Sequence, residues 1–229
     1  HGFRKSLSKF FGIEKFSVPE LRVQQFQALA SQTSMQERES LYSAVRHVYT
    51  GEGDVWDIGC AAGGSSFCLG AGLQDNRDLS CQGKTVKCFD LFSGYSGAAF
   101  ANSGKFSPGM EDIEIFNLQT ESVADFVKAE KLDLVTDLAG YFSGGLVEIA
   151  HIDAAKFLQL WASIFDKISH AIIPGKTIWI FQDFERCRLP WQVYSLAEIR
   201  QFGEIVGGAL NGTVYFKFNS EISSESKRK

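Results

Sequence analysis

The sequence lacks three features, and each absence argues against a class of protein. No apolar stretch approaches the roughly 18 residues of a membrane-spanning helix, and the N-terminal region has no signal-type apolar core. The five cysteines are an odd number and include no C-x-x-C pair, which argues against a disulfide framework or a zinc site. The net charge of -4 argues against a broad nucleic-acid surface. We therefore expect a reduced, cytoplasmic protein that binds neither membranes nor nucleic acid.

The composition is that of one compact domain with a substantial core. The chain has 229 residues, of which 45% are hydrophobic and 22% charged. Its 20 Phe, against 6 Tyr and 4 Trp, predict a core and a pocket built largely from apolar rings. We expect a helical N-terminal segment over 1–50, an α/β domain over 51–219 and a disordered tail over 220–229. The chain starts with His1 rather than Met, as does a piece of a longer protein with additional domains or a chain with a tag scar. Self-association is a separate possibility.

Two helices are expected before residue 50. The first lies in PELRVQQFQALA, and the second starts after Ser34, which stands at capping-box spacing from Glu37. Leu41, Val45 and Val48 then lie on one face of that second helix.

From residue 54 onward, apolar strands alternate with amphipathic helices. The helix with the clearest pattern carries apolar residues at helical spacing from Phe157 to Ile168, and a shorter one has Val123, Phe126 and Val127 on one side. This alternation predicts an α/β protein with a doubly wound, mostly parallel sheet and helices on both faces, whose ligands bind at the carboxyl ends of the strands. The strand candidates are residues 54–58, 85–89, 132–136, 147–152, 177–181 and 213–218.

The turn after the first strand has the spacing Asp57-x-Gly59-x-x-x-Gly63-x-Ser65, without the G-x-G of a dinucleotide fold. Asp57 could receive an ammonium group, the glycines let a ligand approach the backbone, and the following helix directs its amides at a negative group. An ammonium and a carboxylate together describe an amino-acid end, such as the methionine part of S-adenosylmethionine. Asp90, at the end of the second strand, is suited to ribose hydroxyls. Each feature alone would also fit an ordinary glycine-rich turn and a surface aspartate.

Four segments, DIGCAAGGSS, FDLFSGYSG, AHIDAAKF and IPGKTIWIFQDFE, together resemble the macrocin O-methyltransferase family of class I methyltransferases. The resemblance covers residues 33–202 in the right order. It implies a Rossmann-like sheet of seven strands and S-adenosylmethionine as the cofactor. Within the turn it adds Cys60 and Ala61 to the cofactor-binding residues. SMQERESLY resembles the family's cofactor-covering segment and adds Ser34 and Met35.

The resemblance also implies where the chemistry lies. Members of the family generally hold a sugar diol on Mg²⁺, and the matching positions here are Asp153 and Asp183 as metal ligands. The family's base position is Ala155 and its third metal-ligand position is Gln182, so the affinity for Mg²⁺ should be low. Asp153 and His151 are the candidate catalytic residues. Both also have ordinary structural roles open to them, a helix cap for Asp153 and a packed side chain for His151.

Two functions follow from these observations. The first is an S-adenosylmethionine-dependent O-methyltransferase that acts on a sugar or a glycosylated small molecule. The second is a non-catalytic domain of the same fold that binds the cofactor or a partner within a larger glycan-assembly protein. An NAD-dependent oxidoreductase is disfavoured by the missing G-x-G.

Overall fold

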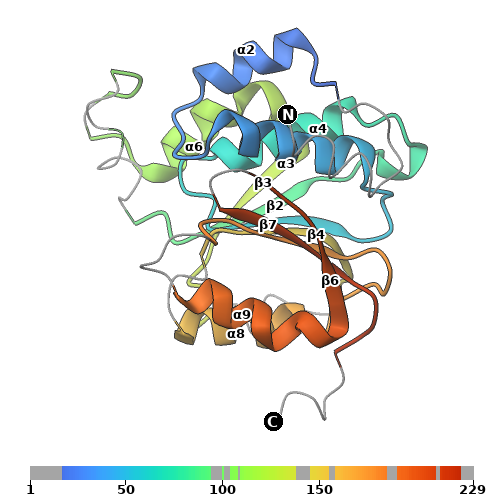
Figure 1. Ribbon diagram of the computed structural model, residues 1–229. Helices are drawn as coiled ribbons and strands as arrows, with labels where there is room; N and C mark the ends of the chain where they lie inside the picture. Colours follow the sequence, from blue (N-terminus) through green and yellow to red (C-terminus); the bar gives the residue numbers. More distant parts are fainter. Residues whose placement is uncertain are drawn as a thin grey trace.

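The protein is built around one seven-stranded sheet (Figure 1). The computed structural model describes residues 17–93, 100, 104–107, 109–137, 145–154, 158–184, 190–209 and 212–222. The strands are β1 (Asp54–Ile58), β2 (Val86–Asp90), β3 (Val127–Lys131), β4 (Val147–Ile152), β5 (Ile178–Phe181), β6 (Gly203–Ala209) and β7 (Thr213–Phe218). Their order is β3-β2-β1-β4-β5-β7-β6. The first five pair in parallel, and β7 runs antiparallel to both of its neighbours. The expected mostly parallel, seven-stranded sheet is confirmed.

Helices cover both faces of this sheet (Figure 1). One face carries α2 (Glu20–Ala28), α3 (Met35–His47), α4 (Gly64–Asp75) and α6 (Asp112–Thr120), and the other carries α8 (Leu158–Ile168) and α9 (Pro190–Ile199). Successive strand residues point to opposite faces. Ile178 and Ile180 therefore join the core under α3 and α4, while Trp179 between them joins the core under α8. Every residue of β4 and β5 is buried, and apart from Glu148 and His151 both strands are apolar, as expected for strands covered on both faces.

The predicted helices agree with the structure where the apolar pattern is long. Ser34 caps α3 and forms the expected capping box with Glu37, since each side chain bonds the other residue's backbone N–H. The short helix expected around Val123 is instead a 3₁₀ helix, η2 (Glu121–Phe126), and Val127 already begins β3. Two further 3₁₀ helices are η1 (Leu79–Cys81) and η3 (Arg200–Phe202).

One strand prediction is wrong. Residues 132–136 do not form a strand, because β3 ends at Lys131 and the chain then turns. Asp133 stabilises the turn by accepting the backbone N–H of Val135 at 2.8 Å. The strand candidates at β1, β2, β4, β5 and β7 are confirmed within one residue at each end.

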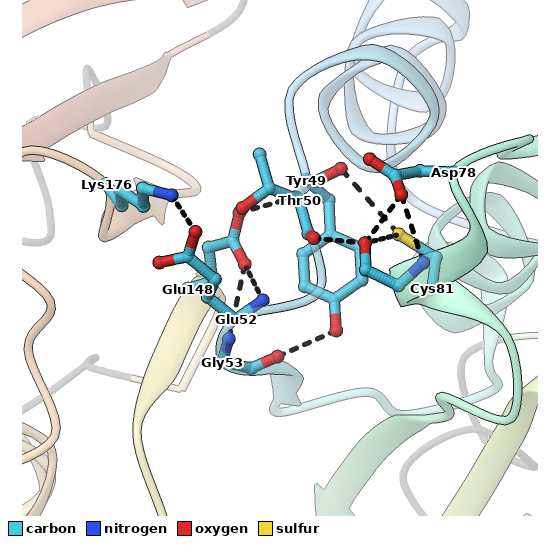
Figure 2. A network of polar contacts seen from close by, with 9 residues as sticks. Tyr49, Thr50, Glu52, Gly53, Asp78, Cys81, Glu148 and Lys176 are labelled. Carbon is cyan, nitrogen blue, oxygen red and sulfur yellow. Dashed lines mark hydrogen bonds and ion pairs between the residues drawn. The ribbon is translucent and has the colours of Figure 1, made fainter.

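A buried glutamate fixes the loop that leads into β1 (Figure 2). Glu148 on β4 is 2% exposed, and its carboxylate accepts the N–H groups of Thr50, Glu52 and Gly53 and the Thr50 hydroxyl at 2.6–3.2 Å. Gly53 must be a glycine, since a Cβ there would lie 2.6 Å from the Glu148 backbone nitrogen. This network aligns the amino ends of β1 and β4, the two central strands.

The opposite edge of the sheet is the one that can hold a ligand. From β1 the chain builds the sheet outward through β2 to β3, and it then returns to place β4 on the other side of β1. The connections that leave the carboxyl ends of β1 and β4 therefore run in opposite directions, which makes this a topological switch point, where open α/β sheets bind their ligands. Within the part of the chain that the structure describes, every helix is too short or too polar to cross a membrane.

Candidate functional site: a pocket at the carboxyl edge of the sheet

A pocket of about 560 Å³ opens at this switch point. Its wall comes from the turn after β1, the end of β2, the segment 30–33 before α3, the loop 132–135, and the residues that follow β4 and β5. Seven of the predicted site residues line it, namely Gly59, Cys60, Ala61, Ser65, Asp90, Asp153 and Asp183. The structure thus brings together residues from four separate sequence motifs.

The turn after β1 presents bare backbone to the pocket. Gly59 and Gly63 both have φ of +86°, in the left-handed region that favours glycine. A Cβ on Gly59 would also lie 3.0 Å from Ala154, and one on Gly63 would lie 2.8 Å from the Phe116 ring. Gly63 lies just outside the lining and acts as the N-cap of α4. The turn therefore needs its glycines for the path of the chain, and α4 begins at the pocket.

Asp90 joins the end of β2 to this turn. Its two carboxylate oxygens accept the Ala61 N–H at 2.8 Å and the Phe92 N–H at 3.0 Å. Burial is the largest influence on the Asp90 carboxyl and raises its pKa. The two backbone hydrogen bonds lower it only in part, so the pKa is raised overall. A carboxylate has about four lone-pair directions, so about two remain for a ligand that donates hydrogen bonds.

Asp57 lies beneath the pocket rather than in it. Its side chain is fully buried, with 0% exposure. One carboxylate oxygen accepts the hydroxyls of Ser65 at 2.8 Å and Ser66 at 2.5 Å, and the other contacts His151 Nδ1 at 2.7 Å. The sequence suggested that Asp57 receives a ligand's ammonium group. In this arrangement it does not do so directly, because its carboxylate is bonded inside the protein. It holds the first turn of α4 against β1 and β4.

His151 is also below the pocket floor. It is 1% exposed, and its Nε2 lies 2.9 Å from Gln182 Oε1. Burial, the largest influence, lowers the pKa of His151. The hydrogen bond to Asp57 and the Asp57 charge outweigh burial, so that the pKa is raised. In the charged form both ring N–H groups donate, one to Asp57 and one to Gln182. Because both nitrogens are engaged inside the protein, the placement of His151 does not suit it to take a proton from a substrate.

The predicted metal ligands Asp153 and Asp183 both line the pocket. Asp183 has φ of +60°, an uncommon conformation for a residue other than glycine. Gln182 between β5 and Asp183 is 5% exposed and turned toward His151. Among the described residues, no group of three or more His, Cys, Asp or Glu side chains could hold a metal ion. Mg²⁺ prefers several oxygen ligands in octahedral geometry, so this set of donors fits it poorly. Ala155 lies outside the described residues.

The wall beside the turn is the segment 30–33, which the sequence did not indicate. The predicted residues Ser34 and Met35 follow it and begin α3, and the Ser34 hydroxyl is used as the helix cap. Arg38 of α3 orders the segment, because its guanidinium donates to Thr33 Oγ1 at 3.1 Å and to the Ser31 carbonyl at 3.0 Å. It also donates to the Phe26 carbonyl.

Gln119 of α6 ties this segment to the turn after β1. Its Oε1 accepts the Ala30 N–H at 2.6 Å, and its Nε2 donates to the carbonyls of Ala30 at 3.0 Å and Ala62 at 2.6 Å. The contact is close enough that a Cβ on Gly64 would lie 2.5 Å from Ser31. No feature of the sequence around Gln119 predicts this role, since its partners lie 57 and 89 residues away.

Several solved structures are similar to this chain. CalS11, a TDP-rhamnose 3'-O-methyltransferase of calicheamicin biosynthesis, superposes with a TM-score of 0.61 at 13% identity, over 93% of this chain and 92% of its own. The O-methyltransferase NovP has a TM-score of 0.59 at 16% identity, over 93% and 96%. An O-methyltransferase from Bacillus cereus in complex with SAH has a TM-score of 0.53 at 15% identity, over 93% and 90%. No family model matches the sequence, and no curated protein is significantly similar to it.

Together with the strand order, these likenesses establish that the chain has the class I methyltransferase fold. The fold expected from the resemblance to macrocin O-methyltransferases is confirmed. At this level of sequence identity the likeness concerns the fold, and the activity has to be argued from the pocket.

Proposed function

We propose that this protein is an S-adenosylmethionine-dependent O-methyltransferase and that the pocket at the switch point binds the cofactor. The observation that carries the proposal is the position of Asp90, at the end of β2 and bonded to the Ala61 N–H of the glycine turn. Its remaining acceptor capacity suits a ribose diol. The bare backbone of the turn and the first amides of α4 suit the amino-acid end of the cofactor. The Bacillus cereus neighbour, whose structure is in complex with SAH, supports the same assignment.

We further propose a sugar or a glycosylated small molecule as the methyl acceptor. When bound, the cofactor supplies an electrophilic methyl group on a sulfonium. The acceptor hydroxyl has to lose its proton as its oxygen bonds to that methyl carbon, and the sulfur retains the electrons of the broken bond. Asp153 lines the pocket and is the best candidate to take the proton. The activity of CalS11 on TDP-rhamnose supports a sugar acceptor.

The direct test is calorimetric titration with S-adenosylmethionine and S-adenosylhomocysteine, with and without Mg²⁺. We expect binding in the micromolar range, or about -7 to -8 kcal/mol. NADH is the control ligand and should not bind. No binding heat and no thermal shift with either form of the cofactor would overturn the assignment of the pocket.

A second function has one observation in its favour. Gln182 stands where the family has a metal-ligating acid, and its amide is engaged by His151. A non-catalytic cofactor-binding domain would tolerate that change.

Tritiated methyl transfer to a panel of nucleotide sugars and glycosides distinguishes the two functions. Turnover by the wild type that is abolished by Asp153→Ala makes the protein an enzyme. A silent wild type that gains activity in Ala155→Asp/Gln182→Asp makes it a binding domain, since a restored general base is worth about 10²–10⁴ in rate.

A further inference from the structure

A second hollow lies on the side of the sheet that carries α2, α3 and α4. It has a volume of about 650 Å³ and is lined by the start of α2, the ends of α3 and α4, and η2. The cofactor pocket lies at the N-terminal end of α4, whereas this hollow lies at its C-terminal end. The 12 residues of α4 span about 18 Å, so the two sites are separate.

One arginine in the hollow is already neutralised. Arg22 is 8% exposed and donates to both oxygens of Asp75 at 2.9 Å, and the Tyr42 hydroxyl donates to Asp75 at 2.7 Å. Three donors therefore occupy most of the acceptor capacity of Asp75. Arg22 also donates to the amide oxygen of Gln74 at 2.6 Å, which holds the end of α4 against α2.

In the described part of the chain, two further arginines line the hollow without a hydrogen bond or ion pair to an acidic side chain, although the charge of Arg46 lowers the pKa of Asp75. Arg46 of α3 lies over the Tyr42 ring, 5.5 Å from its centroid, and donates to the Tyr42 hydroxyl, which is a neutral group. Arg77 is exposed just beyond α4 and makes no hydrogen bond or ion pair within the described part of the chain. The lining thus holds three arginines and one aspartate, which leaves an excess of two positive charges.

We propose that this hollow binds the phosphate group of a small phosphorylated molecule. A phosphate dianion matches the net excess of two positive charges, and arginine forks bind its tetrahedral oxygens with charge-assisted hydrogen bonds. The Ser122 hydroxyl also lines the hollow and offers a neutral donor. Pro19 and Leu21 give it an apolar margin, and Leu21 is 65% exposed. A hollow of about 650 Å³ is much larger than inorganic phosphate, so an organic body fits beside the anion.

The test is calorimetric titration at constant ionic strength with two probes, inorganic phosphate and phenyl phosphate. We expect millimolar binding of phosphate and tighter binding of phenyl phosphate. Arg46→Gln and Arg77→Gln should each weaken binding about three- to tenfold, since both side chains are partly solvated. Arg200→Gln is the matched control, because Arg200 is exposed on η3 and does not line the hollow.

Three results would overturn the proposal. The first is no binding of either probe. The second is an equal loss in Arg200→Gln, which would mean an unspecific charge effect. The third is binding of inorganic phosphate but not of phenyl phosphate, which would leave a site for the free ion only. The affinity for S-adenosylhomocysteine should be the same in all three variants. A failure of the phosphate proposal can therefore be distinguished from a failure of the proposed function.

Discussion

Replacing Gln119 by leucine should open the cofactor pocket without changing a residue that lines it. Leucine is similar in size but removes three hydrogen bonds to Ala30 and Ala62. Ala30 is 5% exposed and Ala62 is 2% exposed, so their backbone groups would be left without partners in a buried setting. An unpaired buried group costs about 1–3 kcal/mol. Gln119 itself is half-buried, and water can reach some of these groups. We therefore expect the free energy of unfolding to fall by about 2–4 kcal/mol in total.

Urea denaturation measures this loss of stability. Calorimetry measures the affinity for S-adenosylhomocysteine, which should fall about five- to tenfold because the segment 30–33 is no longer held in place. Gln119→Glu should give an intermediate result, since a carboxylate accepts the Ala30 N–H but cannot donate to the two carbonyls. Asn117→Leu, exposed on the same helix, should change neither quantity. A Gln119→Leu protein within 0.5 kcal/mol of the wild type, with unaltered affinity, would refute the reasoning.

Three other predictions concern the buried network, the ribose contact and the metal. Because the pKa of His151 is raised on folding, its charged form stabilises the protein below the unfolded pKa of about 6.5, and this contribution is lost as the pH rises through the folded pKa. His151→Gln should therefore cost about 3–5 kcal/mol in urea denaturation at pH 6 and less at pH 9, and an equal cost at both would contradict this assignment. Asp90→Asn should weaken S-adenosylhomocysteine binding in calorimetry by about 1.5–3 kcal/mol, and unchanged affinity would move the ribose elsewhere. Any methyl transfer should depend only weakly on Mg²⁺, so complete loss with a chelator, reversed by micromolar Mg²⁺, would show that Asp153 and Asp183 have found a third ligand.

The interior of the sheet could be predicted from the sequence, and its edges could not. Strands β4 and β5 are mostly apolar because both of their faces are buried, with Glu148 and His151 as the exceptions, and such runs are easily recognised. Strand β3 at one edge reads VKAEK, and β6 at the other edge reads GEIVGGA. Charged side chains and glycines are common at sheet edges, but their local preference for strand is weak. Pairing with β2 and β7 forms these strands, and a single sequence does not reveal that pairing.

At the site, the sequence predicted which residues gather but not which way they face. Asp57 is the penultimate residue of β1 and Asp90 is the last residue of β2, a difference of one position that the sequence alone does not show. The difference comes from partners, since Ser65, Ser66 and His151 enclose Asp57. Among the described residues, Asp90 is bonded to two backbone N–H groups at the pocket wall. His151 lies 94 residues from Asp57 along the chain. Contacts at that separation depend on the register between β1 and β4, which follows from the whole fold.

Gln182 takes part in the buried network at a position that the resemblance assigns to a metal ligand. An aspartate at position 182 would have to leave His151 to serve a metal in the pocket. Glutamine instead reaches inward, and its Oε1 lies 2.9 Å from His151 Nε2. The imidazole of His151 is then held between Asp57 and Gln182. Asp57 in turn accepts the hydroxyls of the first turn of α4, so these hydrogen bonds connect α4 to β4 and to the end of β5. A carboxylate restored at this position would face a charged imidazole, which forms stronger hydrogen bonds with an anion than with an amide. If position 182 is a metal-ligand position, as the resemblance implies, its present side chain is instead bonded to His151 beneath the pocket.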